Sequence, residues 1–211
     1  MTDDHDEADG HSHPHAPIVE EGALSYYQAM EVAVRELLID KGILTADQVR
    51  RQVENMDSRT PARGARVVAT AWLNPDFRAQ LLSDGNAAVE QLGLEHGPYK
   101  LIVVENTSQV HNVIVCTLCS CYPRWLLGLP PDWYKSKSYR SRMVREPRAV
   151  LREFGLELPE STTVRVHDST ADMRYLVLPA RPAETEGWGE EQLAALVTRD
   201  TMVGVAVPAK R

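Results

Sequence analysis

The sequence predicts an α+β protein, in which an N-terminal helical segment precedes a mixed α/β domain. Apolar residues recur at helical spacing up to residue 93, and short β-branched runs appear after residue 100. With 211 residues, the chain is long enough to bury a core without disulfides. We expect three regions: a disordered, acidic, His-rich tail over 1–22, helices over 23–93, and an α+β metal-binding catalytic domain over 94–211.

Each expected helix of the first half has a local start or stop signal. Gly42 suits the C-terminal end of the first helix, and Thr45 with Gln48 forms a capping box for the second. Pro61 suits the first turn of the third helix, which the Asn74-Pro75 pair ends. The expected helices span residues 25–41, 45–56, 61–73 and 76–92.

The second half mixes strands with short helices. A Pro-, Gly- and Trp-rich stretch over 122–135 is expected to form a packed loop with single turns. Residues 137–154 predict two short helices interrupted by Pro147, and 190–198 predict one more. The expected strands are Leu101–Glu105, Asn112–Cys116, Thr163–Val166, Arg174–Leu178 and Thr201–Val207.

Charge and composition exclude several classes of protein. Residues 1–22 hold seven of the 30 acidic residues and no lysine or arginine, so we expect this tail to be disordered. No apolar run approaches the roughly 20 residues that a membrane span needs, and no secretory signal is present. Three clustered cysteines cannot cross-link a secreted fold, so a cytoplasmic protein is expected. The absence of a nucleic-acid-binding motif in an otherwise neutral body argues against nucleic acid as a partner.

Basic residues are concentrated just after the cysteines. Between Arg124 and Arg152, eight lysines and arginines face two acids, Asp132 and Glu146. Such a run is typical of a solvated helical face. Because it directly follows the cysteines, a role near a site or at a subunit contact is the alternative.

The cysteines Cys116, Cys119 and Cys121 lie where an expected strand enters a turn-rich loop. Structural zinc sites and iron–sulfur clusters normally need four side-chain ligands, and only a distant His111 or His167 could complete a zinc site here. A redox dithiol of Cys116 and Cys119 would leave Cys121 without a role. Inert buried cysteines are common, but three within six residues of a loop are not.

The spacing favours a more compact metal site. The sulfurs of Cys119 and Cys121 and the backbone nitrogens of Ser120 and Cys121 can point at one centre, and Cys116 can add a third sulfur. Deprotonating a backbone amide needs a strongly polarising cation, so trivalent cobalt or iron suits this donor set better than zinc. The sixth octahedral position stays open for water or substrate.

The residues around the cysteines resemble a known family. Cys-Thr-Leu-Cys-Ser-Cys-Tyr at 116–122 is similar to the highly specific metal-binding motif of the nitrile hydratase α-subunit family, which includes the thiocyanate hydrolase γ-subunit. The similarity covers most of residues 24–207 and is looser in the helical part. It implies layered sheets between helices (α-β-β-α), with the metal loop between a strand and short helices.

The resemblance implies a non-corrin metal held by the sulfurs of Cys116, Cys119 and Cys121 and by the amides of Ser120 and Cys121. It also implies that Cys119 becomes a sulfinic acid and Cys121 a sulfenic acid. Cys121, Cys119 and Ser120 are therefore the expected catalytic residues, with the Ser120 hydroxyl placed to orient the sulfenate or a water. That hydroxyl can equally serve only the turn of the loop.

The implied reaction is the hydration of a nitrile to an amide by Co3+, because Thr117 and Tyr122 match the family's cobalt form; iron is the less favoured metal. Either the Cys121 sulfenate or an activated water attacks the polarised nitrile carbon, and the sequence leaves both open. The family's site lies at an interface with a β-type partner. We therefore expect a β-type subunit, as one chain or split into two, and an activator protein that loads the metal.

The segment Tyr122-Pro123-Arg124-Trp125 departs from the Tyr-Pro-Trp-Pro of many nitrile hydratases. Arginine here and a His-rich acidic N-terminus are similar to the thiocyanate hydrolase γ-subunit and to three-component members such as the nitrile hydratase of toyocamycin biosynthesis. A cation beside the pocket suits an anionic substrate, so thiocyanate hydrolysis is the alternative function. The sequence of residues 129–135 closely resembles that of nitrile hydratases, which favours nitrile hydration.

Two further assignments stay open at this point. Tyr122, Arg124 and Trp125 are candidate walls of a substrate pocket, although the two aromatic residues fit a core equally well. A non-enzymatic hypothesis is a metal-carrying protein, because the run from His11 to His15 suits cobalt, nickel or zinc.

Overall fold

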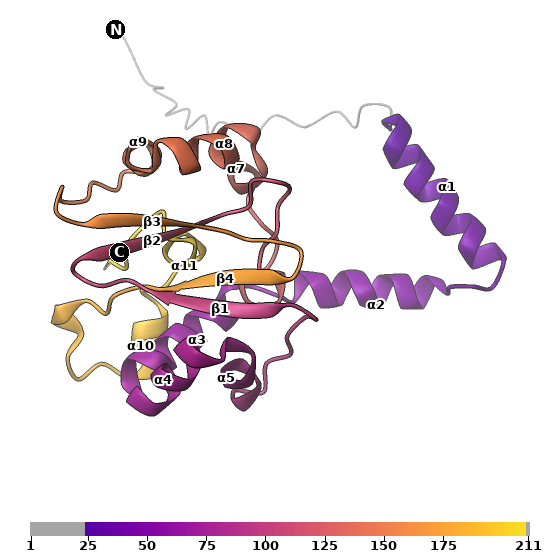
Figure 1. Ribbon diagram of the computed structural model, residues 1–211. Helices are drawn as coiled ribbons and strands as arrows, with labels where there is room; N and C mark the ends of the chain where they lie inside the picture. The colour runs from indigo at the N-terminus through magenta and orange to yellow at the C-terminus, as the bar shows by residue number, and fades with distance from the viewer. Residues whose placement is uncertain (1–23, 210–211) are drawn as a thin grey trace, which may run out of the picture. The chain divides into compact units, whose positions relative to one another are not determined.

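The computed structural model describes residues 24–209 (Figure 1). The tail expected over residues 1–22 lies outside this range, so its disorder stays a prediction. The chain forms two compact units that divide after Arg50. Within residues 24–209, we find no helix with the length and apolar character needed to cross a membrane.

The first unit contains α1 (Tyr26–Asp40) and the start of α2 (Ala46–Asp57). The predicted capping box is confirmed: Thr45 N donates to Gln48 Oε1 at 2.8 Å, and Gln48 N donates to Thr45 Oγ1 at 3.1 Å. Gly42 adopts φ +66°, the left-handed conformation expected just after a helix. Local sequence therefore determines both helix ends.

The second unit begins with the rest of α2 and continues with α3 (Pro61–Leu73), α4 (Pro75–Ser83) and α5 (Gly85–Gln91). The single helix predicted over 76–92 is wrong, because Asp84 interrupts it. Its side chain accepts a hydrogen bond from Ala87 N at 3.1 Å and caps α5. The chain bends there, and α4 and α5 both pack against β1 (Lys100–Glu105).

Two parallel, two-stranded sheets follow. β1 pairs with β4 (Met173–Leu178), and β2 (Val110–Val115) pairs with β3 (Thr163–Asp168). α4 and α5 contact the first sheet, whereas α8 (Lys137–Arg145) contacts the second. Figure 1 shows helices on the outer side of each sheet, which confirms the expected α-β-β-α layers.

The chain between the second and third strands forms short helices, as predicted. Pro147 separates α8 from α9 (Pro147–Glu153), and α9 contacts β3. The expected single turns before them are α6 (Arg124–Leu127) and α7 (Asp132–Lys135). α8 and α9 cover the second sheet, whereas α6 packs against α3 and α7 against α8.

The last predicted strand, Thr201–Val207, is wrong. After η1 (Ala183–Thr185) and α10 (Glu190–Ala194), the chain forms α11 (Arg199–Val203). Thr198 begins this helix by accepting a hydrogen bond from Thr201 N, so the helix predicted over 190–198 also ends early. α11 packs against β4, and this burial outweighs the β propensity of the run.

Candidate metal centre

Cys116 directly follows β2, and its side chain is buried, whereas Thr117 and Cys119 are exposed. The parallel register pairs Val115 with Asp168, so β3 ends beside the start of the loop. Thr117 N and Oγ1 donate to the two carboxylate oxygens of Asp168 at 2.9 and 2.6 Å. This pair holds the loop where it leaves the sheet.

A buried tyrosine holds the other end of the loop. Tyr134 OH donates to the carbonyl oxygen of Cys121 at 2.9 Å, and the Tyr134 side chain is 0% exposed. The rings of Tyr134 and Tyr122 pack edge to face, with centroids 5.1 Å apart. At the first end of the loop, Arg140 Nη1 also donates a hydrogen bond to the carbonyl oxygen of Thr117 at 3.3 Å.

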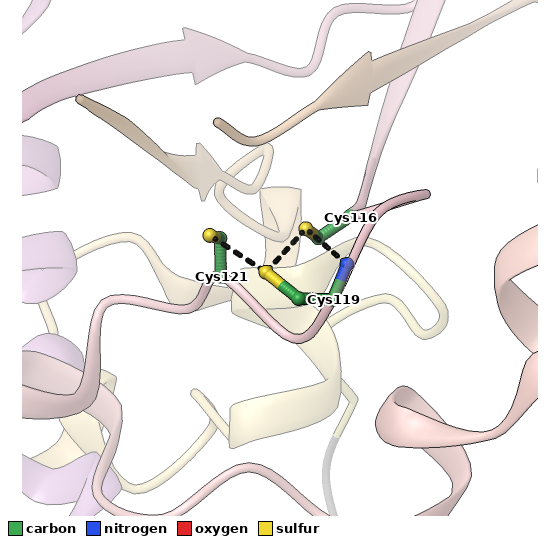
Figure 2. A group of neighbouring side chains, drawn as sticks. All are labelled: Cys116, Cys119 and Cys121. Atoms are coloured by element: carbon green, nitrogen blue, oxygen red, sulfur yellow. Dashed lines mark hydrogen bonds between the residues drawn. The ribbon is translucent and has the colours of Figure 1, made fainter. Parts of the chain in front are cut away.

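Figure 2 shows the three cysteine sulfurs turned toward one another on the inner side of this loop. Cys119 Sγ lies 3.5 Å from Cys116 Sγ and 3.2 Å from Cys121 Sγ. All three sulfurs lie within 4.8 Å of one another, a spacing that one bound ion can bridge. The structure thus brings the three predicted sulfur ligands together.

The sulfurs differ in electrostatic environment. The hydrogen bond from Cys121 is the main cause that lowers the pKa of Cys119, and the backbone amides of Ser120 and Cys121 act in the same direction. Burial, and then the Cys119 hydrogen bond, raises the pKa of Cys121 to about 12. Three sulfurs thus lie close together, and the amides of Ser120 and Cys121 lie near one of them. This donor set fits a small, strongly polarising cation.

A cavity of about 520 Å³ opens beside the sulfurs. Cys119, Ser120 and Cys121 line it, but the buried Cys116 does not. The three predicted pocket residues also line it: Tyr122, Arg124 and Trp125.

The two aromatic pocket residues serve the core as well. Tyr122 and Trp125 are 3% and 4% exposed and belong to the hydrophobic cluster of the second unit. The Trp125 indole N–H has no hydrogen-bond partner among the described residues. Arg124 is exposed at the cavity wall, so it is the one of the three that offers a charge to a ligand.

The distant histidines do not join the cysteines. His111 Nε2 donates to the carbonyl of Gly204 at 2.7 Å, and His167 Nε2 lies 2.8 Å from Asn112 Oδ1. In the part of the chain that the structure describes, the one group suited to hold a metal consists of the three cysteines. The geometry therefore gives no support to a zinc site completed by either histidine.

Most side chains of the basic segment are exposed, and two of them form ion pairs away from the loop. Arg142 contacts Glu146 and Glu153 at 2.6 and 2.5 Å, and Lys135 contacts Asp132 at 2.7 Å. Two members reach the site, Arg124 at the cavity and Arg140 at the loop. The segment is chiefly the solvated face that its composition predicts.

Several residues that line the cavity were not predicted as site residues, among them His96, Tyr99 and Arg174. A carbonyl and a carboxylate hold His96, since its Nδ1 lies 2.7 Å from Gly97 O and its Nε2 lies 2.7 Å from Glu90 Oε1. These contacts, with the carbonyl the larger cause, raise the pKa of His96. Gly97-Pro98 marks a loop in the sequence, but no local signal places that loop beside the cysteines.

Residues 25–206 match the family described as nitrile hydratase, alpha chain. The chain is 51% identical over 181 residues to the cobalt-containing nitrile hydratase subunit alpha of Pseudonocardia thermophila, covering 84% of this chain and 88% of that protein. It is 44% identical over 205 residues to the thiocyanate hydrolase subunit gamma of Thiobacillus thioparus, covering 92% and 84% respectively.

The fold is also similar to that of solved structures. A double mutant of the Fe-type nitrile hydratase from Comamonas testosteroni Ni1 superposes with a TM-score of 0.82 at 46% identity. The match covers 86% of this chain and 90% of that one. Similar proteins therefore include cobalt-containing and Fe-type members and a thiocyanate hydrolase subunit.

Proposed function

The chain belongs to the nitrile hydratase α-chain family, and from this premise we propose that it is the α-subunit of a cobalt nitrile hydratase. The reaction adds water to a nitrile and yields the amide. The observation that carries the proposal is the convergence of three sulfurs within 4.8 Å, two of which belong to residues that line a cavity.

The proposed ligands are the sulfurs of Cys116, Cys119 and Cys121 and the backbone nitrogens of Ser120 and Cys121. The mutual approach of the sulfurs and the action of both amides on Cys119 support this set. Non-corrin Co3+ is the proposed metal, because the similar α-subunit of Pseudonocardia thermophila is named as cobalt-containing. Iron remains the alternative, since an Fe-type structure has the same fold.

The chain's own residues divide the chemical work. A trivalent cation held here supplies Lewis acidity toward a nitrile nitrogen or a water. Cys119 and Cys121 are proposed to carry sulfinic and sulfenic oxygens, and both residues line the cavity that is proposed to receive the substrate. Ser120 lies between them and is proposed to orient the attacking oxygen, which is either the Cys121 sulfenate or a water.

The pocket walls orient the substrate and exclude water. Tyr122 and Trp125 offer rigid aromatic surface, because both are buried in the core on their other side. Arg124 adds a positive charge at the cavity. A small nitrile would fill only part of a cavity of about 520 Å³, so another surface has to enclose the substrate.

We assign that enclosing surface to a β-type subunit, as one chain or two. Leu118, next to Cys119 in the loop, is 85% exposed, and Leu129 at the cavity wall is 49% exposed. Apolar side chains this exposed beside a reactive site are typical of a surface that a partner covers. An activator protein that loads cobalt, and a cytoplasmic location, complete the proposal.

Thiocyanate hydrolysis is the second candidate function. It is favoured by Arg124, a charge at the cavity wall that suits a monoanion, and by 44% identity to a thiocyanate hydrolase subunit. In that case the chain acts as the γ-type subunit with the same metal site.

One experiment separates the two functions. The chain is co-expressed with its β-type partner in cobalt medium, and the complex is given aliphatic nitriles and thiocyanate separately. Amide formation supports nitrile hydration, whereas carbonyl sulfide and ammonia support thiocyanate hydrolysis. Intact mass should show cobalt and three added oxygens per chain.

Cys121→Ser tests the metal site itself. We expect it to abolish turnover, because one sulfur ligand and the proposed sulfenate are lost together. Ser161→Ala, an exposed change before β3, serves as the control and should keep both metal and activity. Full turnover with one cobalt per Cys121→Ser chain would overturn the assignment.

A further inference from the structure

Arg174 is a buried arginine at the wall of the cysteine cavity. It lies near the start of β4, and its residue is 8% exposed. Burying a guanidinium is costly unless its N–H groups and its charge are satisfied. Among residues 24–209, no carboxylate forms a salt bridge with Arg174. Its charge is therefore available to something other than an acidic side chain.

Two sets of contacts hold the guanidinium in one place. Nη1 donates to the carbonyl oxygens of Thr170, Ala171 and Met173, at 3.1 Å for the last two. The guanidinium carbon lies 4.1 Å from the centre of the Tyr99 ring, in a cation–π contact. The parallel pairing of β1 with β4 creates this contact, because it joins Lys100 to Met173 in register.

The fixed charge lies beside the cysteine loop. Arg174 and Tyr99 line the same cavity as Cys119, Ser120 and Cys121. A cysteine binds a metal ion as the thiolate, so Cys119 and Cys121 bring negative charge to the wall that Arg174 shares. Arg142 and Lys135 of the basic segment are paired with acids instead. Arg174 thus provides a positive charge where a metal-bound sulfur is negative.

We infer that Arg174 is a positioning residue of the metal centre, which acts through Cys121 by balancing the negative charge that this sulfur carries as a metal ligand. The inference rests on the proposed metal site and assigns part of its electrostatic support to this chain rather than to a partner. Tyr99 supports Arg174 in this role, because its ring fixes the plane of the guanidinium.

Substitution of Arg174 tests the inference in the full-length chain with its partner. Arg174→Gln removes the charge and should weaken the binding of Co2+ to the metal-free complex by 10- to 100-fold, the usual effect of losing an outer-shell partner. Arg174→Lys keeps the charge without the planar fork, so it should restore most of that loss. Binding is followed by the thiolate-to-cobalt absorption band, whose wavelength should shift in Arg174→Gln.

Matched variants separate this role from a merely structural one. Tyr99→Phe keeps the ring and should keep the cobalt affinity of the parent, whereas Tyr99→Ala should reproduce part of the loss of affinity. Arg152→Gln, an exposed change on α9, should alter nothing. Each variant's unfolding temperature is measured as well, because a structural role predicts a loss of stability with an unchanged absorption band.

The outcomes distinguish this inference from the proposed function. If the parent complex binds no cobalt and hydrates no nitrile, the proposed function fails. If the parent is loaded and active but Arg174→Gln keeps the same affinity, band position, kcat and KM, the role of Arg174 is overturned while the function stands. Equal losses in Arg174→Lys and Arg174→Gln would also overturn it, since retained charge would then have no effect.

Discussion

Asp168 at the end of β3 accepts two hydrogen bonds from Thr117, one from the backbone nitrogen at 2.9 Å and one from the hydroxyl at 2.6 Å. The parallel register of β2 and β3 places Val115 opposite Asp168, so the loop begins beside that carboxylate. The position of Cys116 therefore depends on a residue about fifty positions later in the chain. The pair links the sheet directly to the geometry of the sulfurs.

Asp168→Asn should loosen the loop, because an amide offers one acceptor oxygen where the carboxylate offers two. We expect the free energy of unfolding to fall by about 1 kcal/mol, the usual net value of one hydrogen bond. Cobalt per chain should fall more clearly than stability. Urea unfolding and metal analysis measure the two effects. Asp172→Asn makes the same chemical change at an exposed turn and should leave both unchanged.

Tyr134→Phe should displace the other end of the loop. The hydroxyl donates to Cys121 O at 2.9 Å, and its loss leaves that carbonyl without this partner at a cost of about 1–2 kcal/mol. Tyr139→Phe is a matched control, because Tyr139 OH donates to Ile114 O at 2.7 Å within β2. The two variants should lose similar stability in urea unfolding, but only Tyr134→Phe should lose cobalt. Equal cobalt contents would contradict a role for Tyr134 in the loop.

Local signals predict the helix ends and breaks well. The Thr45 capping box, Pro61 and Pro147 act within a few residues of their own position, so they are visible in the sequence. Gly204 shows why residues 201–207 do not form the expected strand. It adopts φ +92°, and a Cβ there would collide with the carbonyl of Asn112. That requirement comes from β2, far away in the chain, and no local pattern reveals it.

The residues of the candidate site also fall into those that the sequence predicts and those that it does not. Cys116, Cys119 and Cys121 are close in sequence, so their spacing alone predicts that they converge. His96 and Arg174 reach the same cavity through a loop and through the pairing of β4 with β1. Neither belongs to a short motif that marks a site. Residues that support a site from distant elements are the part that sequence reasoning misses.

His111 should make stability depend on pH in the acidic range. Its Nε2 donates to Gly204 O, and its Nδ1 lies 3.2 Å from the amide nitrogen of Asn106, the pattern of a neutral imidazole. Burial is the main cause that lowers the pKa of His111, against the opposing effect of the Gly204 carbonyl. Below about pH 6.5 the unfolded chain binds a proton that the folded chain excludes.

The contribution of His111 to the free energy of unfolding should therefore fall as the pH drops below about 6.5 and stay level on the alkaline side of that value. His111→Gln should flatten the acidic slope, even though the variant is less stable overall. His167, whose pKa is also lowered by burial, retains part of the slope. Urea unfolding at a series of pH values gives the difference between parent and variant, and a difference independent of pH would refute the assignment.

Arg124→Gln should separate charged from neutral substrates. Arg124 is exposed at the cavity wall, where one positive charge attracts an anion by about 1 kcal/mol, or roughly fivefold in affinity. In the loaded complex, the KM or inhibition constant of thiocyanate should rise by about that factor. The KM of acetonitrile should stay within about twofold, because a neutral nitrile gains little from the charge. Arg145→Gln on α8 is the control, since Arg145 does not line the cavity. Equal changes for both substrates would show that Arg124 shapes the pocket without selecting charge.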